Sequence, residues 1–279
     1  MQHPYLLQSL AMDVIDLTDV YWERNLTSYT SGGAYLKASC EIEGITYYLK
    51  LSNYDDERGF VGFESVYEYL ASRVGMLLGF DVLDSEVLKA RLVHNGREYT
   101  TFVQKAADFL PAGMSKVPFE RVYETQKLPG ETRLEFLRRS GFGQRADEML
   151  LFDYLIYNRD RHCNNLEFIK NGGLELAPLF DNGVSFFAPL TNRKKEILAF
   201  DVLTNYITNS DFGTRYLEDN LVLIEDACLR VPTLSKEELS EALFKVFGED
   251  EDFPSWHREK ILELLVQRMR RAQELLDNR

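Results

Sequence analysis

The sequence predicts an α+β fold with two lobes. A small antiparallel, β-rich N-lobe is expected over residues 1–106 and a mainly helical C-lobe over residues 107–279. Short runs of β-branched and aromatic residues, separated by turn signals, dominate the first part. After Ala106 the apolar residues recur instead at helical spacing. A chain of 279 residues has the length for one large domain or for two lobes that share a cleft.

Two hairpins and one helix are expected in the N-lobe. Glu43-Gly44 and Asn95-Gly96 supply residue types that tight hairpin turns need. Between the hairpins, apolar residues at spacings of three and four predict a helix that begins near Phe63, and Gly79 suits its C-terminal cap. The strands expected beside the two turns are residues 35–42, 45–51, 82–93 and 98–104.

The C-lobe should combine helices with one small hairpin. Residues 146–157 are strongly apolar and helix-like, and residues 254–276 repeat apolar positions as a final helix does. Asn171-Gly172-Gly173 predicts a hairpin turn between strands at 166–169 and 174–180. From Asp201 onward the chain is expected to be helical again.

Composition excludes several classes of protein. Lys and Arg total 32 against 45 Asp and Glu, a net charge of −13, which argues against coating nucleic acid. No stretch approaches the roughly 20 apolar residues of a membrane helix, so no membrane partner is expected. The sequence starts without the pattern of a signal peptide, and its three cysteines lack C-x-x-C spacing. We therefore expect a cytoplasmic, soluble protein without disulfides or a zinc site.

Three polar side chains are candidates for chemistry. Asp160 and Asn165 lie in a polar loop after the apolar helix, and Asp181 follows the next hairpin. A hairpin returns the chain to its starting point, so these side chains can converge. The oxygens of Asn165 and Asp181 suit a hard cation such as Mg²⁺. Asp160 could position or deprotonate an attacking hydroxyl group.

The N-lobe can supply the other parts that phosphoryl transfer from ATP requires. Lys50, at the end of its strand, could reach the nucleotide phosphates, aimed by an ion pair with Glu64; Glu68 is the competing partner. The residues expected to cover the phosphates are Ser31, Gly32 and Gly33, and those expected to receive adenine through their backbone are Val103, Gln104 and Lys105.

The order of these features resembles the HipA-like class of protein kinases. The resemblance spans roughly residues 27–183 and is carried by Asp160-Arg161-His162-Cys163-Asn164-Asn165 and Phe180-Asp181-Asn182-Gly183. The D-R-H-x-x-N loop is also similar to that of phosphatidylinositol 3/4-kinases. The resemblance implies a protein-kinase-like fold, with Asp160 as the catalytic aspartate, Asn165 and Asp181 as magnesium ligands, and Lys50 on the phosphates.

The same resemblance implies partners and modification sites. HipA-like toxins usually carry Lys where this chain has Asn164, and full-length members have an N-terminal subdomain that contacts an antitoxin. The loop here begins near residue 27, so a short form is expected, with a protein substrate and an antitoxin or other regulatory protein as partners. Autophosphorylation is implied at Ser28, Thr30 or Ser31, where a phosphate would compete with ATP.

The leading prediction is thus an ATP- and Mg²⁺-dependent serine/threonine protein kinase that also autophosphorylates, as bacterial toxins of this class do. Each residue alone has an ordinary interpretation, because a strand-end lysine such as Lys50 is usually solvated and Asp181-Asn182-Gly183 is typical of a turn. Two alternatives stay open. One is a lipid or small-molecule kinase, and the other is a kinase-fold module that binds a partner without turnover.

Overall fold

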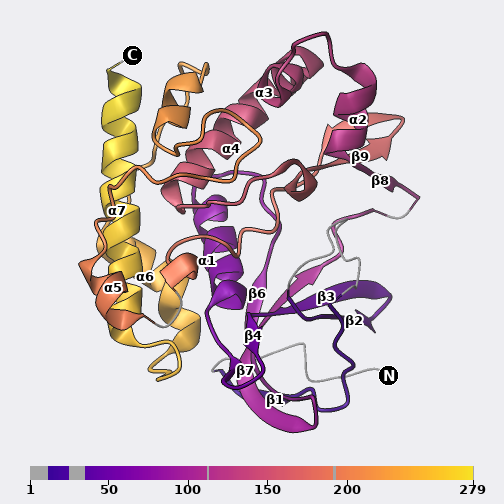
Figure 1. The fold of residues 1–279 in the computed structure, drawn as a ribbon, viewed down its shortest axis with the longest axis vertical. Helices are drawn as coiled ribbons and strands as arrows, with labels where there is room; N and C mark the ends of the chain where they lie inside the picture. The colour runs from indigo at the N-terminus through magenta and orange to yellow at the C-terminus, as the bar shows by residue number, and fades with distance from the viewer. Residues whose placement is uncertain (1–11, 25–34, 112, 191–192, 279) are drawn as a thin grey trace.

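The computed structural model describes residues 12–24, 35–111, 113–190 and 193–278. It has the two predicted lobes, one built on a five-stranded sheet and one mainly helical (Figure 1). The sheet order is β1-β6-β7-β3-β2, with β1 parallel to β6 and all other neighbours antiparallel. The strands are β1 Val14–Asp16, β2 Lys37–Ile42, β3 Ile45–Leu51, β6 Glu86–His94 and β7 Arg97–Ala107, and a separate short pair joins β4 Tyr54–Asp55 to β5 Gly59–Phe60.

Both predicted hairpin turns of the N-lobe are confirmed. Glu43 and Gly44 have φ of 53° and 80°, and Asn95 and Gly96 have φ of 50° and 72°. Positive φ at both central residues matches the right-handed twist of the adjoining strands. Some bounds differ from the prediction, since β2 begins at Lys37 rather than at residue 35, β6 begins at Glu86 rather than at residue 82, and β7 ends at Ala107 rather than at residue 104. Strands β1, β4 and β5 were not predicted.

Helix α1, Glu64–Leu77, lies between the sheet and the helices of the C-lobe (Figure 1). Gly79 follows it with φ of 74°, as expected of a helix C-terminus. Val66, Leu70 and Val74 of α1 are fully buried in a core that continues into the C-lobe. Helix α1 therefore ties the two lobes together, and whatever it carries is held rigidly at their junction.

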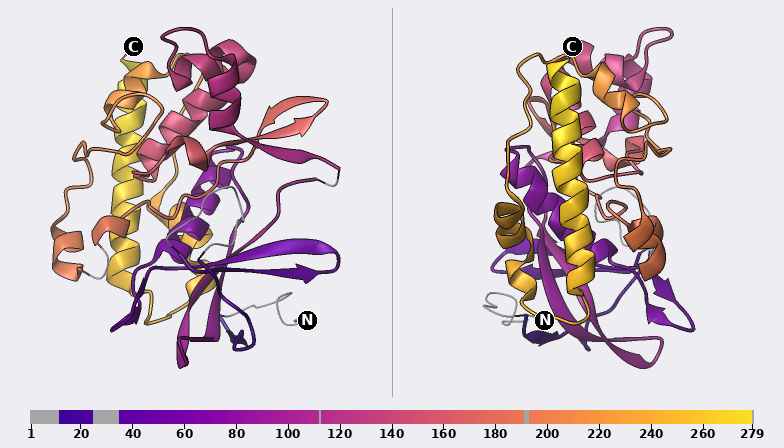
Figure 2. Two further views of the ribbon diagram at one scale, coloured as in Figure 1. Left: turned by 45° about the vertical axis from the view of Figure 1, so that its right-hand side comes forward. Right: turned by 90° about the vertical axis from the view of Figure 1, so that its left-hand side faces the viewer.

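The C-lobe is built around α4 and the long C-terminal helix α7 (Figure 2). Both were predicted, as was the hairpin of β9 and β10, but the third strand of that sheet, β8, was not. None of the described helices is long and apolar enough to cross a membrane. The elements are β8 Ser115–Pro118, α2 Phe119–Gln126, α3 Arg133–Leu137, α4 Gly143–Leu155, β9 Glu167–Asn171, β10 Gly173–Leu176, α5 Lys194–Ala199, α6 Lys236–Phe244 and α7 Ser255–Asp277.

The expectation of helix from Asp201 onward is wrong for residues 201–235. The only helical segment there is a short 3₁₀ turn, Asp219–Leu223, and the rest is irregular. Polar side chains bond to nearby backbone instead: Ser210 Oγ accepts from the Phe212 amide at 3.1 Å, and Thr214 Oγ1 accepts from the Tyr216 amide at 3.1 Å. Such local bonds compete with helix formation. The segment folds as loops over the C-lobe.

A buried histidine in α7 predicts a pH dependence of stability. His257 is fully buried, and its Nε2 lies 2.8 Å from the hydroxyl of Tyr67 on α1. Burial lowers the pKa of His257 to about 4. An unfolded chain, with an ordinary histidine pKa near 6.5, takes up a proton between pH 6.5 and 4 that the folded chain does not. The free energy of unfolding should therefore fall by about 3 kcal/mol as pH drops through this window.

Urea unfolding at pH 7, 6 and 5 measures this effect in the wild type and in His257→Gln. The glutamine keeps an acceptor for Tyr67 and cannot take up a proton in this range. The difference in the free energy of unfolding between the two proteins reports on His257 alone, because the carboxylates that titrate in the same range contribute equally to both. A difference in the free energy of unfolding that stays constant from pH 7 to pH 5 would contradict the assignment.

Candidate active site

Lys50 lies at the centre of a buried ion-pair cluster between the two lobes. Strand β3 places it one residue before the strand ends, and its Nζ contacts the Asp181 carboxylate and lies 3.7 Å from Oε2 of Glu68. The predicted lysine–glutamate pair is therefore formed by Glu68, the competing candidate, and not by Glu64. The Glu64 carboxylate instead accepts a hydrogen bond from the Asn53 amide at 3.2 Å, at the entrance of α1.

Burial shapes the ionisation of this cluster. It disfavours the charge of Lys50, but Asp181 and Glu68 outweigh that effect and raise the pKa of Lys50. It also opposes ionisation of Asp181, yet Lys50 lowers the pKa of Asp181 below its ordinary value. For Glu68 burial dominates and raises the pKa. Lys50 and Asp181 therefore each stabilise the charged form of the other.

The predicted catalytic loop follows α4 directly. Asn158 is fully buried, donates to Asp153 Oδ1 at 2.8 Å and accepts from the Asp160 amide at 3.1 Å, which fixes the course of the backbone. The Asp160 side chain is 31% exposed, so a substrate can reach it. Its Oδ1 accepts from Asn209 Nδ2 at 2.8 Å, and its Oδ2 lies 3.7 Å from His162 Nε2.

Asn165 presents an oxygen without a hydrogen-bond partner. Its Nδ2 donates to the Asp160 carbonyl at 2.8 Å, which directs its Oδ1 the other way. That Oδ1 is buried and has no partner among the described residues. A buried orphan amide oxygen costs free energy unless something else satisfies it. Together with the Asp181 carboxylate it makes two oxygen donors that fit Mg²⁺, which usually takes its other ligands from phosphates and water.

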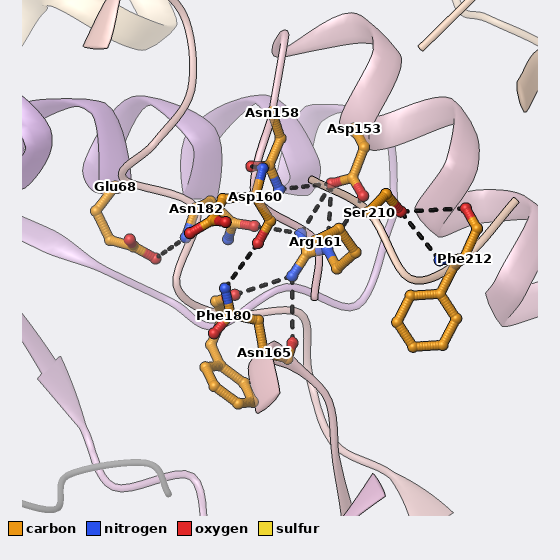
Figure 3. A network of polar contacts seen from close by, with 10 residues as sticks. All are labelled: Glu68, Asp153, Asn158, Asp160, Arg161, Asn165, Phe180, Asn182, Ser210 and Phe212. Atoms are coloured by element: carbon orange, nitrogen blue, oxygen red, sulfur yellow. Dashed lines mark hydrogen bonds and ion pairs between the residues drawn. The ribbon is translucent and has the colours of Figure 1, made fainter. Parts of the chain in front are cut away.

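Arg161 connects the loops that carry these donors, as Figure 3 shows. Its guanidinium is only 1% exposed and donates from Nη1 to the carbonyls of Asn165 at 3.3 Å and Phe180 at 3.0 Å. Nη2 donates to Asn182 Oδ1 at 2.6 Å, and an ion pair with Asp153 at 2.9 Å neutralises the buried charge. One side chain therefore holds Asn165 itself and the two residues that flank Asp181.

Sequence reasoning missed the roles of Arg161 and Asn209. Arg161 belongs to the quoted motif, but no pattern indicates that an arginine in a polar loop is buried. Asn209 lies in the segment expected to be helical, yet the amides of Asn209 and Asp211 bond to the carbonyls of Arg159 and Arg161 at 2.7 and 3.0 Å. This pairing lays an extended segment beside the catalytic loop, and only the folded chain reveals it.

The adenine prediction for Val103, Gln104 and Lys105 does not fit the structure. These residues lie in the C-terminal half of β7, where each pairs in register with β6 on one side and β3 on the other. The sheet thus uses their backbone groups, and they are not available to a base. Gln104 still lines the cavity beside Lys50 and Asp181 through its side chain. Pairing with β6 ends at Lys105, whereas pairing with β3 continues to Ala107.

Ser31, Gly32 and Gly33, expected over the phosphates, lie outside the described residues, as do Ser28 and Thr30. Their roles stay predictions. The described part of the site therefore consists of Lys50, Glu68 and Asp181 in one ion-pair cluster and of Asp160 and Asn165 in the catalytic loop.

Comparisons with known proteins agree with this geometry at the level of fold. No family model and no curated protein sequence matches the chain. Among solved structures, the Helicobacter pylori proinflammatory kinase CtkA is similar, with 15% identity and a TM-score of 0.66 over 95% of this chain and 97% of that chain. Hydra Fam20 with sugar (14% identity, TM-score 0.45, 88% and 81% covered) and the Golgi casein kinase (14%, 0.42, 98% and 75%) are more distant. The likeness to CtkA confirms the predicted fold class: the chain has a protein-kinase-like fold.

Proposed function

We propose that this chain is an ATP- and Mg²⁺-dependent kinase that transfers the γ-phosphoryl group to a serine or threonine hydroxyl of a protein. The observation that carries the proposal is the ion-pair cluster of Lys50, Glu68 and Asp181. The loop before Asp181 is joined through Arg161 to the loop that carries the orphan oxygen of Asn165. Phosphoryl transfer depends on positioning and on charge, and this cluster supplies both.

Each residue of the site has a defined task in this proposal. Asn165 and Asp181 hold Mg²⁺, which neutralises phosphate charge when bound. Lys50 exchanges its contact with Asp181 for the phosphates of the nucleotide while Glu68 keeps the ammonium in place. Asp160 orients the acceptor hydroxyl and takes its proton, and Asn209 holds Asp160 in the orientation that this requires.

The adenine ring is assigned a different position from the one that the sequence predicts. Beyond Lys105 strand β6 no longer pairs with β7, whereas β7 continues along β3 to Ala107, so the sheet is open on the side that β6 leaves. Leu83, Ala106 and Phe180 form a small apolar cluster with Phe109 at this point. An apolar wall with one adjacent polar strand edge is a suitable environment for a base.

The finer aspects of the proposal come from sequence. The D-R-H-x-x-N loop and the metal aspartate support a HipA-like type, with a toxin role, an antitoxin or regulatory partner and autophosphorylation at Ser28, Thr30 or Ser31. The solved structure of CtkA is described as that of a bacterial proinflammatory kinase, and its likeness supports phosphotransfer as the class of reaction.

Intact-protein mass after incubation with Mg²⁺ and ATP tests the proposal. Phosphoryl adducts are expected on the wild type and not on Asp160→Asn, which keeps the oxygen that accepts from Asn209. Fragment spectra then locate the modified residue, and a protein mixture in the same reaction tests transfer to other acceptors. Growth arrest on expression that disappears in Asp160→Asn would support the toxin role.

Two results would redirect the proposal. Transfer to phosphoinositide vesicles but not to any protein would favour the lipid-kinase alternative. Tight ATP binding without transfer to any acceptor would favour a binding module. Adducts that appear equally on Asp160→Asn would contradict the role given to Asp160.

A further inference from the structure

A second buried lysine lies directly opposite Lys50. Lys37 of β2 and Lys50 of β3 are partners in the antiparallel register. Side chains of directly opposed residues lie on the same face of a sheet, close together. Lys37 is only 3% exposed, and it lines the same cavity as Lys50, Glu68 and Asp181. The mechanism proposed above uses Lys50 and leaves Lys37 without a task.

Burying a second ammonium beside the first is costly. Lysine is almost never fully buried unless opposite charge is close by, and like charges repel strongly where water is excluded. Burial and the neighbouring Lys50 lower the pKa of Lys37, while Asp181 and Glu68 partly offset this. A lysine whose only purpose was to stabilise the fold would not be expected beside another lysine.

The charges that line the cavity suit a phosphate chain when Mg²⁺ is bound. Two ammonium groups face two carboxylates, so the cavity is close to electrically balanced by itself. When Asp181 serves Mg²⁺, the positive charges exceed the negative ones, and this surplus suits a phosphate chain. Lys37 stands at the start of β2, a few residues after the glycines expected to cover the phosphates.

We propose that Lys37 is a second phosphate-binding residue, which contacts the phosphate chain of a nucleoside triphosphate together with Lys50. This inference rests on the proposed function, because it requires the phosphates of a bound nucleotide to lie against Lys50. With two ammonium groups aimed at the phosphates, the site distinguishes ATP from adenosine mainly by charge. Glu68 keeps Lys50 in place, whereas Lys37 extends from β2, the strand that follows the glycine-containing segment in the sequence.

Calorimetric titration with ATP, ADP and adenosine in the presence of Mg²⁺ tests the inference. Lys37→Met removes the charge and keeps an unbranched apolar stem of similar length. Its affinity for ATP should fall about tenfold or more, since a charge-assisted hydrogen bond is lost. Its affinity for adenosine should equal that of the wild type. Lys37→Arg, which keeps a cation at this position, should retain most of the affinity for ATP.

Lys89→Met is the matched control. Lys89 lies in β6 of the same sheet, its side chain is 14% exposed, and its ion pairs with Asp250 and Asp252 lie outside the cavity. This variant should bind ATP as the wild type does. Thermal unfolding of each ligand-free variant shows whether it is folded, and Lys37→Gln replaces Lys37→Met in the comparison if the latter does not unfold cooperatively.

The possible failures can be told apart. A wild type that binds no ATP would overturn the proposed function together with this inference. A wild type that binds ATP, with Lys37→Met binding it equally well, would overturn only the role of Lys37. Equal weakening of ATP and adenosine would also overturn that role, because it would mean that Lys37 shapes the cavity rather than binding phosphate.

Discussion

Asp181→Asn is expected to lower the rate of phosphoryl transfer by about 10³-fold and to leave the fold intact. The metal loses its only carboxylate among the two assigned ligands, which removes several kcal/mol of charge stabilisation in the transition state. Asn suits the backbone here, because Asp181 has φ of 57°, a conformation that Asn and Asp tolerate better than most residues. Lys50 keeps Glu68 as its counter-charge.

Initial rates at saturating ATP and Mg²⁺ measure this effect, and the Mg²⁺ dependence of ATP binding gives a second readout. Asp84→Asn is the control, because that side chain is 69% exposed and pairs with Arg73 away from the cavity. It should retain the wild-type rate. An Asp181→Asn protein that kept a tenth or more of the wild-type rate would remove Asp181 from the metal site.

Arg161→Met is expected to affect both stability and activity. Its partner Asp153 would keep a buried charge without compensation, which costs about 3–5 kcal/mol of the free energy of unfolding. The carbonyls of Asn165 and Phe180 would also lose the donor that joins their loops. Displacement of these loops by about 1 Å would lower the transfer rate by about 10²-fold.

The double variant Arg161→Met/Asp153→Asn separates these two effects. It removes both buried charges, and the new amide oxygen can still accept from Asn158. Urea unfolding should show that most of the lost stability returns, because replacing both members of a buried ion pair is often nearly neutral. The transfer rate should remain low, because the two loops are still not connected. Recovery of stability and rate together would mean that Arg161 is needed only for folding.

The hairpin turns and the main helices could be predicted because they depend on patterns within a few neighbouring residues. Glu43-Gly44 and Asn95-Gly96 each need positive φ at two successive residues, and few residue types other than these accept that conformation. The apolar spacing of α1 and α7 likewise depends only on helix geometry. The candidate chemistry of Asp160, Asn165 and Asp181 came from residue type and order along the chain, which the fold brings to one region through Arg161.

Two of the errors concern contacts between segments distant in sequence, and the third concerns polar side chains that bond to nearby backbone. Glu64 and Glu68 are one helical turn apart and equally acidic, and only the placement of α1 against β3 decides that Glu68 reaches Lys50. The backbone of Val103–Lys105 is occupied because β6 and β3 both pair with β7. Polar side chains that bond locally made the region after Asp201 irregular.

The sequence by itself therefore determined the two-lobed α+β class, the hairpins, the main helices and the residue types available for phosphoryl transfer. Tertiary structure decided which of those residues meet. It selected Glu68, buried Arg161 between two loops, brought Asn209 to Asp160 and set Lys37 opposite Lys50. The reason is that backbone propensities act over a few residues, whereas ion pairs and burial depend on distances that only the packed chain defines.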